Sequence, residues 1–162
     1  MATTYDSLTT TTLGSNTTSF TISSISQAYS DLVMVIEGPP ISEVSMDGNI
    51  QFNSDTGSNY SDTRAQNNYC DTSNNASSAR FCAPGNGGRF MTTLEIIGYS
   101  QTNTWKTYLA RGGSWQNIGT ITDFYCGLWR STAAISSITV ISGQGRNFIA
   151  GTKVNLFGVL RA

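Results

Sequence analysis

Residues 31–37, Asp-Leu-Val-Met-Val-Ile-Glu, decide the fold class of this sequence. The five apolar residues at 32–36 are partly β-branched, and Gly38-Pro39-Pro40 follows closely behind them. An apolar run of this length favours a buried β-strand over a helix, and Pro-Pro behind it marks the end of the element. Residues 90–99, Phe-Met-Thr-Thr-Leu-Glu-Ile-Ile-Gly-Tyr, predict a second strand.

Polar and apolar residues alternate with a period of two on both sides of these strands, and almost nothing repeats at the helical period. Asp47-Gly48 stands between alternating apolar residues and predicts a β-hairpin, because a type I′ turn needs positive φ at both central residues. Further strands are predicted at residues 5–13, 18–22, 104–110, 119–129, 135–141 and 152–160. The pattern predicts an all-β fold, an antiparallel, jelly-roll-like β-sandwich of eight to ten short strands with no significant helix; a barrel is the alternative.

The length of 162 residues predicts a single β-sandwich domain spanning 1–162. Residues 61–89 are its least patterned part and are rich in Asn, Ser and Gly. They predict a long irregular exposed loop, apart from a short strand near 60–64. Loops of this length usually carry function, so this region is expected to face outward.

The charge balance excludes several functions. The chain carries 9 basic and 10 acidic side chains and only two lysines, Lys106 and Lys153, so no nucleic acid partner is expected. It has no histidine, which excludes Ser-His-Asp and Cys-His relays and His-ligated zinc. The longest apolar run is too short for membrane insertion, and residues 1–13 lack the basic and apolar regions of a signal peptide. No cofactor and no metal are predicted.

Three cysteines, Cys70, Cys82 and Cys126, leave two interpretations open. The first is three free thiols, with Cys126 buried in a strand. The second is a disulfide between Cys70 and Cys82, which flank a polar stretch and could close it as a loop. A disulfide there would suit an extracellular protein.

Two groups of acidic residues are candidates for chemistry. Glu95 and Asp123 fall in predicted strands and could meet as the carboxyl pair of a glycosidase, but no spacing in the sequence specifies such a pair. The alternative places Glu95 on an exposed face and Asp123 beside a turn. Asp55, Asn59 and Asp62 offer calcium-type oxygen ligands without matching the EF-hand pattern, so a turn held by Asx hydrogen bonds is favoured. No catalytic residue is therefore assigned.

Aromatic residues are the candidates for binding a sugar by stacking. Trp105 and Trp129 lie in predicted strands among apolar residues, so core packing is expected for both. Trp115 follows Gly-Gly-Ser and is expected in a polar loop, either as a plug over the end of the sandwich or as a ligand contact. Tyr60 and Tyr69 are weaker ligand-binding candidates of the same kind.

Three stretches of the chain carry a resemblance to a known group of proteins. They are residues 50–61 (IQFNSDTGSNYS), residues 127–139 (GLWRSTAAISSIT) and the pair FIAGT and LFGV within residues 148–159. The segments ATTY at 2–5 and SDLV at 30–33 fit the same pattern. Together they resemble small virion structural proteins of tailed phages that infect aquatic cyanobacteria and marine bacteria. The resemblance implies a location on the outside of a phage particle, as tail fibre, head fibre or capsid decoration, and assigns no functional residue.

The chain has few charged residues that could prevent further strands from pairing with the expected sheet edges. These edges are therefore expected to be covered by copies of the chain or by other proteins. The sequence therefore predicts a homo-oligomer, with a trimer as the expected form, in contact with other virion proteins. The leading hypothesis is a non-enzymatic structural protein on the virion surface, made in the host cytoplasm and released by lysis, with a role in attachment to host cell-surface glycan. The alternatives are a soluble carbohydrate-binding β-sandwich module and, less favoured, a glycan depolymerase.

Overall fold

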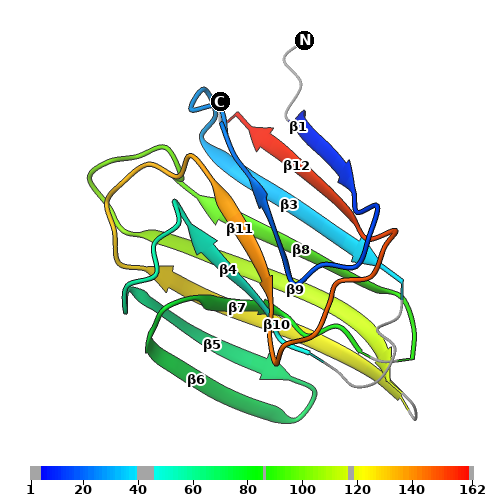
Figure 1. The fold of residues 1–162 in the computed structure, drawn as a ribbon. Helices are drawn as coiled ribbons and strands as arrows, with labels where there is room; N and C mark the ends of the chain where they lie inside the picture. The colour runs from blue at the N-terminus through cyan, green and yellow to red at the C-terminus, as the bar shows by residue number, and fades with distance from the viewer. Residues whose placement is uncertain (1–4, 40–45, 86, 117–118, 161–162) are drawn as a thin grey trace.

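The computed structural model describes residues 5–39, 46–85, 87–116 and 119–160. This part of the chain contains twelve β-strands and no helix, and hence no helix that could cross a membrane (Figure 1). The strands are β1 (Tyr5–Thr12), β2 (Ser19–Ile22), β3 (Asp31–Gly38), β4 (Gly48–Phe52), β5 (Tyr60–Gln66), β6 (Tyr69–Ala76), β7 (Ala79–Cys82), β8 (Phe90–Ile97), β9 (Lys106–Gln116), β10 (Gly119–Trp129), β11 (Ile138–Ser142) and β12 (Lys153–Val159). The all-β prediction is confirmed, with more strands than the eight to ten expected.

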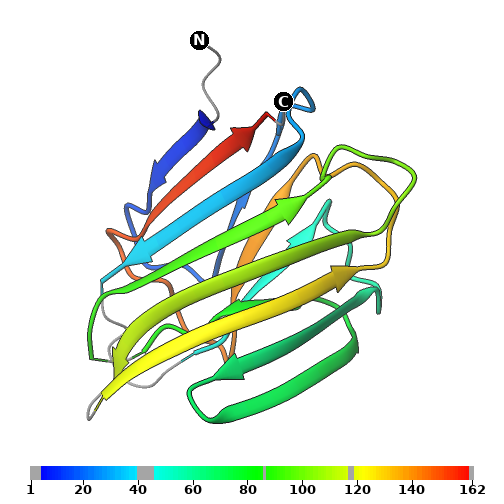
Figure 2. The same cartoon turned by 180° about the vertical axis from the view of Figure 1, so that it is seen from behind.

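The strands form two antiparallel sheets that pack face to face. The larger sheet has the order β1-β12-β3-β8-β9-β10-β5-β6, and the smaller sheet has the order β2-β11-β4-β7. Figure 1 shows the small sheet in front of the large one, and Figure 2 shows the large sheet from its outer side. Neighbours such as β1 and β12 come from opposite ends of the chain, as in jelly-roll-like sandwiches. The antiparallel β-sandwich is therefore confirmed.

The core lies between the two sheets, and strand periodicity explains which residues enter it. In β3, Leu32, Met34 and Ile36 are fully buried, whereas the residues between them face outward and are half-buried. Successive side chains of a strand point to opposite faces, so one residue in two reaches the core. Aromatic rings supply most of the largest buried side chains, namely Phe52, Tyr60, Phe81, Tyr99, Tyr108, Tyr125, Trp129 and Phe148.

The segment at 61–89 is not the long irregular loop predicted from the sequence. β5 and β6 form a hairpin around Asn67, whose φ of 49° lies in the left-handed region, and β7 pairs with β4. Thr63 and Thr72 hydrogen-bond across this hairpin (3.3 Å). Because β6 is an edge strand with polar side chains on both faces, its sequence carries no apolar alternation that would reveal a strand.

The predicted hairpin at Asp47-Gly48 is also wrong. Gly48 is the first residue of β4, whose neighbours are β11 and β7. Most of the strand expected before the turn falls on residues 40–45, which lie outside the described residues. A Cβ at Gly48 would collide with the sulfur of Cys82, so close packing of β4 against β7 explains this glycine.

Candidate functional site

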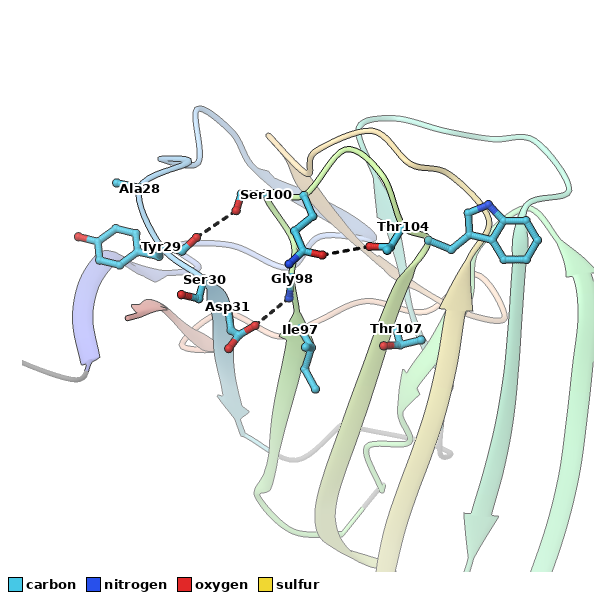
Figure 3. Close-up of a pocket in the computed structure, with 11 residues that line it drawn as sticks. Ala28, Tyr29, Ser30, Asp31, Ile97, Gly98, Ser100, Thr104 and Thr107 are labelled. Atoms are coloured by element: carbon cyan, nitrogen blue, oxygen red, sulfur yellow. Dashed lines mark hydrogen bonds between the residues drawn. The ribbon is translucent and has the colours of Figure 1, made fainter. Parts of the chain in front are cut away.

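A polar hollow of about 680 Å³ opens at one end of the large sheet, where β3 and β9 begin and β8 ends (Figure 3). Residues 28–31 form one wall, and residues 97–107 form the other. The lining is mainly hydroxyl, amide and carboxyl groups, with two aromatic residues: Ala28, Tyr29, Ser30, Asp31, Ile97, Gly98, Ser100, Gln101, Thr104, Trp105 and Thr107. A hollow of this size and composition can hold a small polar ligand.

The floor of the hollow is a row of three side chains on the outer face of the sheet. Asp31 in β3 is the register partner of Ile97 in β8, and Ile97 is the partner of Thr107 in β9. Register partners point to the same side of a sheet, so a carboxylate, an aliphatic chain and a hydroxyl group stand side by side. Figure 3 shows the three residues next to one another on adjacent strands.

The turn after β8 fastens the two walls together. Gly98 has a φ of 61°, which glycine adopts without strain, and its N–H donates to the Asp31 carboxylate (2.7 Å). The Gly98 carbonyl accepts the N–H of Gln101 (3.1 Å), and the Ser100 hydroxyl donates to the carbonyl of Tyr29 (3.1 Å). Two of these hydrogen bonds therefore join the two walls directly.

Lys106 stabilises the wall formed by residues 97–107 from its buried side. It is only 1% exposed, and its Nζ donates to the carbonyls of Thr104 (2.8 Å) and Thr132 (3.2 Å). Burial lowers the pKa of this ammonium group. The Thr104 hydroxyl in turn donates to Gln101 Oε1 (3.2 Å), so the wall is tied both to the segment after β10 and to itself.

Trp105 lies at the rim of the hollow and is 54% exposed, so the prediction that it packs in the core is wrong. The inward positions of β9 are Lys106, Tyr108 and Ala110. The opposite face of the strand, which includes Leu109, points to solvent. Both faces carry apolar residues in the sequence, and a period of two does not tell which of them meets the core. Core packing of Trp129, by contrast, is confirmed, since it is 2% exposed.

Two of the aromatic residues predicted to bind a ligand do not line the hollow. Tyr60 is fully buried, and its hydroxyl accepts the N–H of Phe52 (2.9 Å) and donates to the carbonyl of Asp55 (3.2 Å). It cannot touch a ligand, because its position in β5 points into the core. Tyr69 is 55% exposed at the start of β6, where the Arg64 guanidinium lies 5.3 Å from its ring centroid.

Trp115 belongs to β9 and not to a polar loop as predicted. The strand continues through Gly112, which pairs with Thr92 on the adjacent strand, and a side chain at this position would collide with Thr92. Trp115 is 45% exposed, and its carbonyl accepts the N–H of Gly87 (3.3 Å). Eight residues of extended strand, about 27 Å, separate it from Thr107, so it lies far from the hollow.

The three cysteines are free thiols, and the disulfide between Cys70 and Cys82 is therefore not formed. Cys70 is exposed on the outer face of edge strand β6, whereas Cys82 is buried between the sheets. Cys126 is exposed and not buried as predicted, since its register partner Leu109 also faces outward. The preceding residue, Tyr125, is the one that points into the core, because neighbouring residues of a strand face opposite sides of the sheet.

Glu95 and Asp123 do not form a carboxyl pair, because they point to opposite faces of the sheet. Glu95 lies on the outer face, as one alternative proposed, and is ion-paired with Arg111 (2.8 Å). Asp123 is 3% exposed on the inner face, in the middle of β10 and not beside a turn. Burial raises its pKa to about 6, and hydrogen bonds from Gln66 (2.7 Å) and Ala83 (3.3 Å) only partly oppose this.

Asp55, Asn59 and Asp62 do not converge on one point. The Asp55 carboxylate accepts the N–H of Gly57 (2.8 Å), the amide of Asn59 (2.9 Å) and the indole N–H of Trp129 (2.7 Å). Burial raises the pKa of Asp55, but these three bonds outweigh it and hold the pKa below its ordinary value. The turn held by Asx hydrogen bonds is thus confirmed, and the described ranges contain no cluster of three or more acidic or cysteine ligands.

A network of ion pairs lies between the sheets beside β5 and β6, and no pattern in the sequence indicates it. Arg80 binds Asp62 and Asp71, both at 2.7 Å, and Arg64 binds Asp71 (3.0 Å) and Asp47 (3.1 Å). Burial raises the pKa of Asp62, whereas the two guanidinium groups overcome burial and lower the pKa of Asp71. These charges satisfy one another, so the network joins the two sheets and offers little to a ligand.

No protein-family model matches the chain, and no curated protein matches it. Among solved structures, the galectin LEC-6 of Caenorhabditis elegans is 10% identical, with 94% of this chain and 96% of that chain covered and a TM-score of 0.38. An endo-β-1,4-glucuronan lyase from the fungus Trichoderma reesei is 9% identical, with 93% of this chain and 79% of that chain covered and a TM-score of 0.31. Similarity at this level concerns the fold alone.

Proposed function

We propose that this chain is a non-catalytic β-sandwich that binds a saccharide in the hollow at the ends of β3, β8 and β9. The observation that carries the proposal is an exposed indole, Trp105, at the rim of a polar hollow. Saccharides present apolar C–H surfaces beside hydroxyl groups, and binding sites of this kind combine aromatic or aliphatic surface with a few placed polar groups. Asp31, Ile97 and Thr107 supply such a combination on the floor of the hollow.

Binding without turnover is proposed because this hollow is lined by one carboxyl group where glycoside hydrolysis needs two. Asp31 is the single carboxyl among the described residues that line the hollow. Its Oδ1 accepts the N–H of Gly98, which fixes it in place. Glu95, on the same outer face, is engaged with Arg111. The arrangement therefore suits the orientation of ligand hydroxyls.

Titration of the purified protein with a panel of oligosaccharides tests this proposal. Trp105→Ala should weaken binding at least about tenfold, equivalent to about 1.4 kcal/mol, and Thr107→Arg should abolish it by filling the hollow. Trp115→Ala is the matched control, since it removes another exposed indole (45%, against 54% for Trp105) at the far end of β9 and should not change saccharide affinity. Binding that depends on Trp115 and not on Trp105, or no saccharide binding at all, would refute the proposal. Release of shorter fragments from the bound sugar would refute its non-catalytic part.

A second proposal concerns where this domain works. We propose that it is a structural subunit on the surface of a tailed-phage virion, where saccharide binding serves attachment to host glycan. The sequence resemblance supports this setting, and so do the edges of the large sheet. β1 and β6 carry one aspartate each, Asp6 and Asp71, and no lysine. Charge-poor edge strands are prone to pairing with further strands, so contacts with sister subunits and other virion proteins are expected.

The exposed apolar residues of the outer face, Met91, Leu109 and Phe124, support assembly independently. Sedimentation at micromolar concentration should give a homo-oligomer, with a trimer as the expected form. Mass spectrometry of purified phage particles should detect the chain. A monomer in sedimentation, together with absence of the chain from particles, would overturn this second proposal and leave the saccharide site untouched.

A further inference from the structure

The floor of the hollow is part of a longer row that crosses the large sheet. From Ile97 the register partners continue in both directions, through Asp31 to β12 and through Thr107 to β10 and β5. Six strands contribute one residue each, in the order Val159, Asp31, Ile97, Thr107, Leu128 and Ser61. At the usual spacing of neighbouring strands the row is about 24 Å long. Figure 2 shows β12, β8 and β10 pointing their arrowheads toward this end of the sheet.

Three hollows follow this row and share lining residues. The central hollow shares Asp31 and Ile97 with a second one of about 170 Å³, which extends over β12 to β1. It shares Thr107 with a third one of about 270 Å³, which extends over β10 and β5 to β6. The three hollows therefore lie end to end across the strands, from β1 to β6, and are together called the groove.

The side chains of the row alternate in character. Those from β12, β8 and β10 are aliphatic, and those from β3, β9 and β5 carry a carboxylate or a hydroxyl group. A linear glycan alternates in a similar way between C–H surfaces and hydroxyl edges, and its repeat is comparable in length to the spacing between strands. The groove thus offers apolar contact and hydrogen bonding in turn along such a chain.

The charges around the row argue for an uncharged ligand. The row contains one carboxylate, Asp31, and no cationic side chain. Arg111 is ion-paired with Glu95, and Arg130 donates to the Ser61 hydroxyl (2.7 Å) at the far end of the row. Acidic polysaccharides and nucleic acids require clustered cations, which the groove does not supply.

We infer that this groove binds a linear, uncharged glycan chain laid across the strands, with the central hollow as one of several adjoining subsites. The inference rests on the proposed saccharide binding at the central hollow. It goes further by specifying the length, the charge and the direction of the ligand.

The dependence of affinity on chain length tests the inference. The probes are linear gluco-, manno- and galacto-oligosaccharides as disaccharide, tetrasaccharide and hexasaccharide, with an oligogalacturonate hexamer as the acidic counterpart. In the uncharged series that binds, the hexasaccharide should bind at least about tenfold more tightly than the disaccharide, because it occupies more subsites. A hexasaccharide that binds no more tightly than the disaccharide would overturn the inference, as would preferential binding of the acidic hexamer.

Substitutions with arginine locate the groove. Thr63→Arg, in the third hollow, should reduce hexasaccharide affinity about tenfold and leave disaccharide affinity unchanged. Thr122→Arg makes the same change at an exposed position of β10 outside the three hollows and should alter neither affinity. Equal effects of these two variants would reject the groove and leave the central site intact. If no saccharide of any length binds, the proposed function itself fails.

Discussion

The indole N–H of Trp129 donates a hydrogen bond of 2.7 Å to the carboxylate of Asp55, joining the turn after β4 to the last residue of β10. Trp129 is 2% exposed and stacks in the core with Tyr60, at 6.4 Å between ring centroids. Removal of the carboxylate would leave a buried donor without a partner, which is more costly than the loss of an exposed hydrogen bond. This contact therefore stabilises the end of the sandwich where β9 begins and β10 ends.

Asp55→Ala should lower the free energy of unfolding by about 2 kcal/mol in urea denaturation. Its hydrogen bonds hold the folded-state pKa of Asp55 below its ordinary value of 3.8. The stabilisation by the ionised carboxylate is therefore present above pH 3.8 and is lost as the pH falls through the folded-state pKa. The difference in stability between wild type and variant should shrink with acidification in that window; a difference independent of pH would contradict the role of the charge.

Asp123→Asn should remove a contribution to the free energy of unfolding that, unlike that of Asp55, is lost as the pH rises. Burial raises the pKa of Asp123 from 3.8 to about 6, so the folded protein holds this proton more tightly than the unfolded chain does. The resulting stabilisation is full below pH 3.8 and is lost as the pH rises through about 6, by about 3 kcal/mol in total. The free energy of unfolding of wild type minus that of the variant, measured in urea, should therefore decrease by about 3 kcal/mol between acid and neutral pH. A difference that does not change with pH would contradict the raised pKa of Asp123.

Tyr125→Phe and Tyr108→Phe form a matched pair. Both rings are buried, but the Tyr125 hydroxyl has no hydrogen-bond partner among the described residues, whereas the Tyr108 hydroxyl donates to the carbonyl of Arg80 (2.6 Å). Tyr125→Phe should leave the free energy of unfolding unchanged or raise it, because it removes an unsatisfied buried group. Tyr108→Phe should lower it by about 1 kcal/mol. Equal losses in thermal or urea unfolding would show that both hydroxyls are satisfied.

A thiol reagent should distinguish the three cysteines. Cys70 and Cys126 are exposed and should react in the folded protein. Cys82 is buried, and burial raises the pKa of its thiol, so it should react only after unfolding. Peptide mapping of the labelled protein identifies the sites. Native labelling of Cys82, or protection of Cys70 that is relieved by a reductant, would contradict this assignment.

Sequence patterns predicted the strands whose two faces differ. β3 has its core residues at alternate positions, and β8 and β12 repeat the arrangement, so burial leaves a period of two in the sequence. β6 leaves none, since it is polar on both faces at the edge of the sheet. The sequence of the β5 and β6 hairpin therefore predicts a loop, although the turn residue Asn67 lies within it.

The candidate site was harder to predict than the fold. Residues 98–105 contain a run of hydroxyl and amide side chains that ends in Trp105, and this is the signal that could have indicated the hollow. The strand predicted at 104–110 hides this signal, because it places Trp105 among the core residues. The carboxylate and hydroxyl groups of the floor come from Asp31 and Thr107, which are far apart in the chain and meet only through strand register.

By itself, the sequence determined that this chain forms short antiparallel strands with turns between them, because alternation and turn chemistry act over a few neighbouring residues. Only the tertiary structure decided which face of each strand meets the core and which side chains share a row. Strand register depends on packing of the whole sandwich, and a shift by one residue exchanges the buried face for the exposed one.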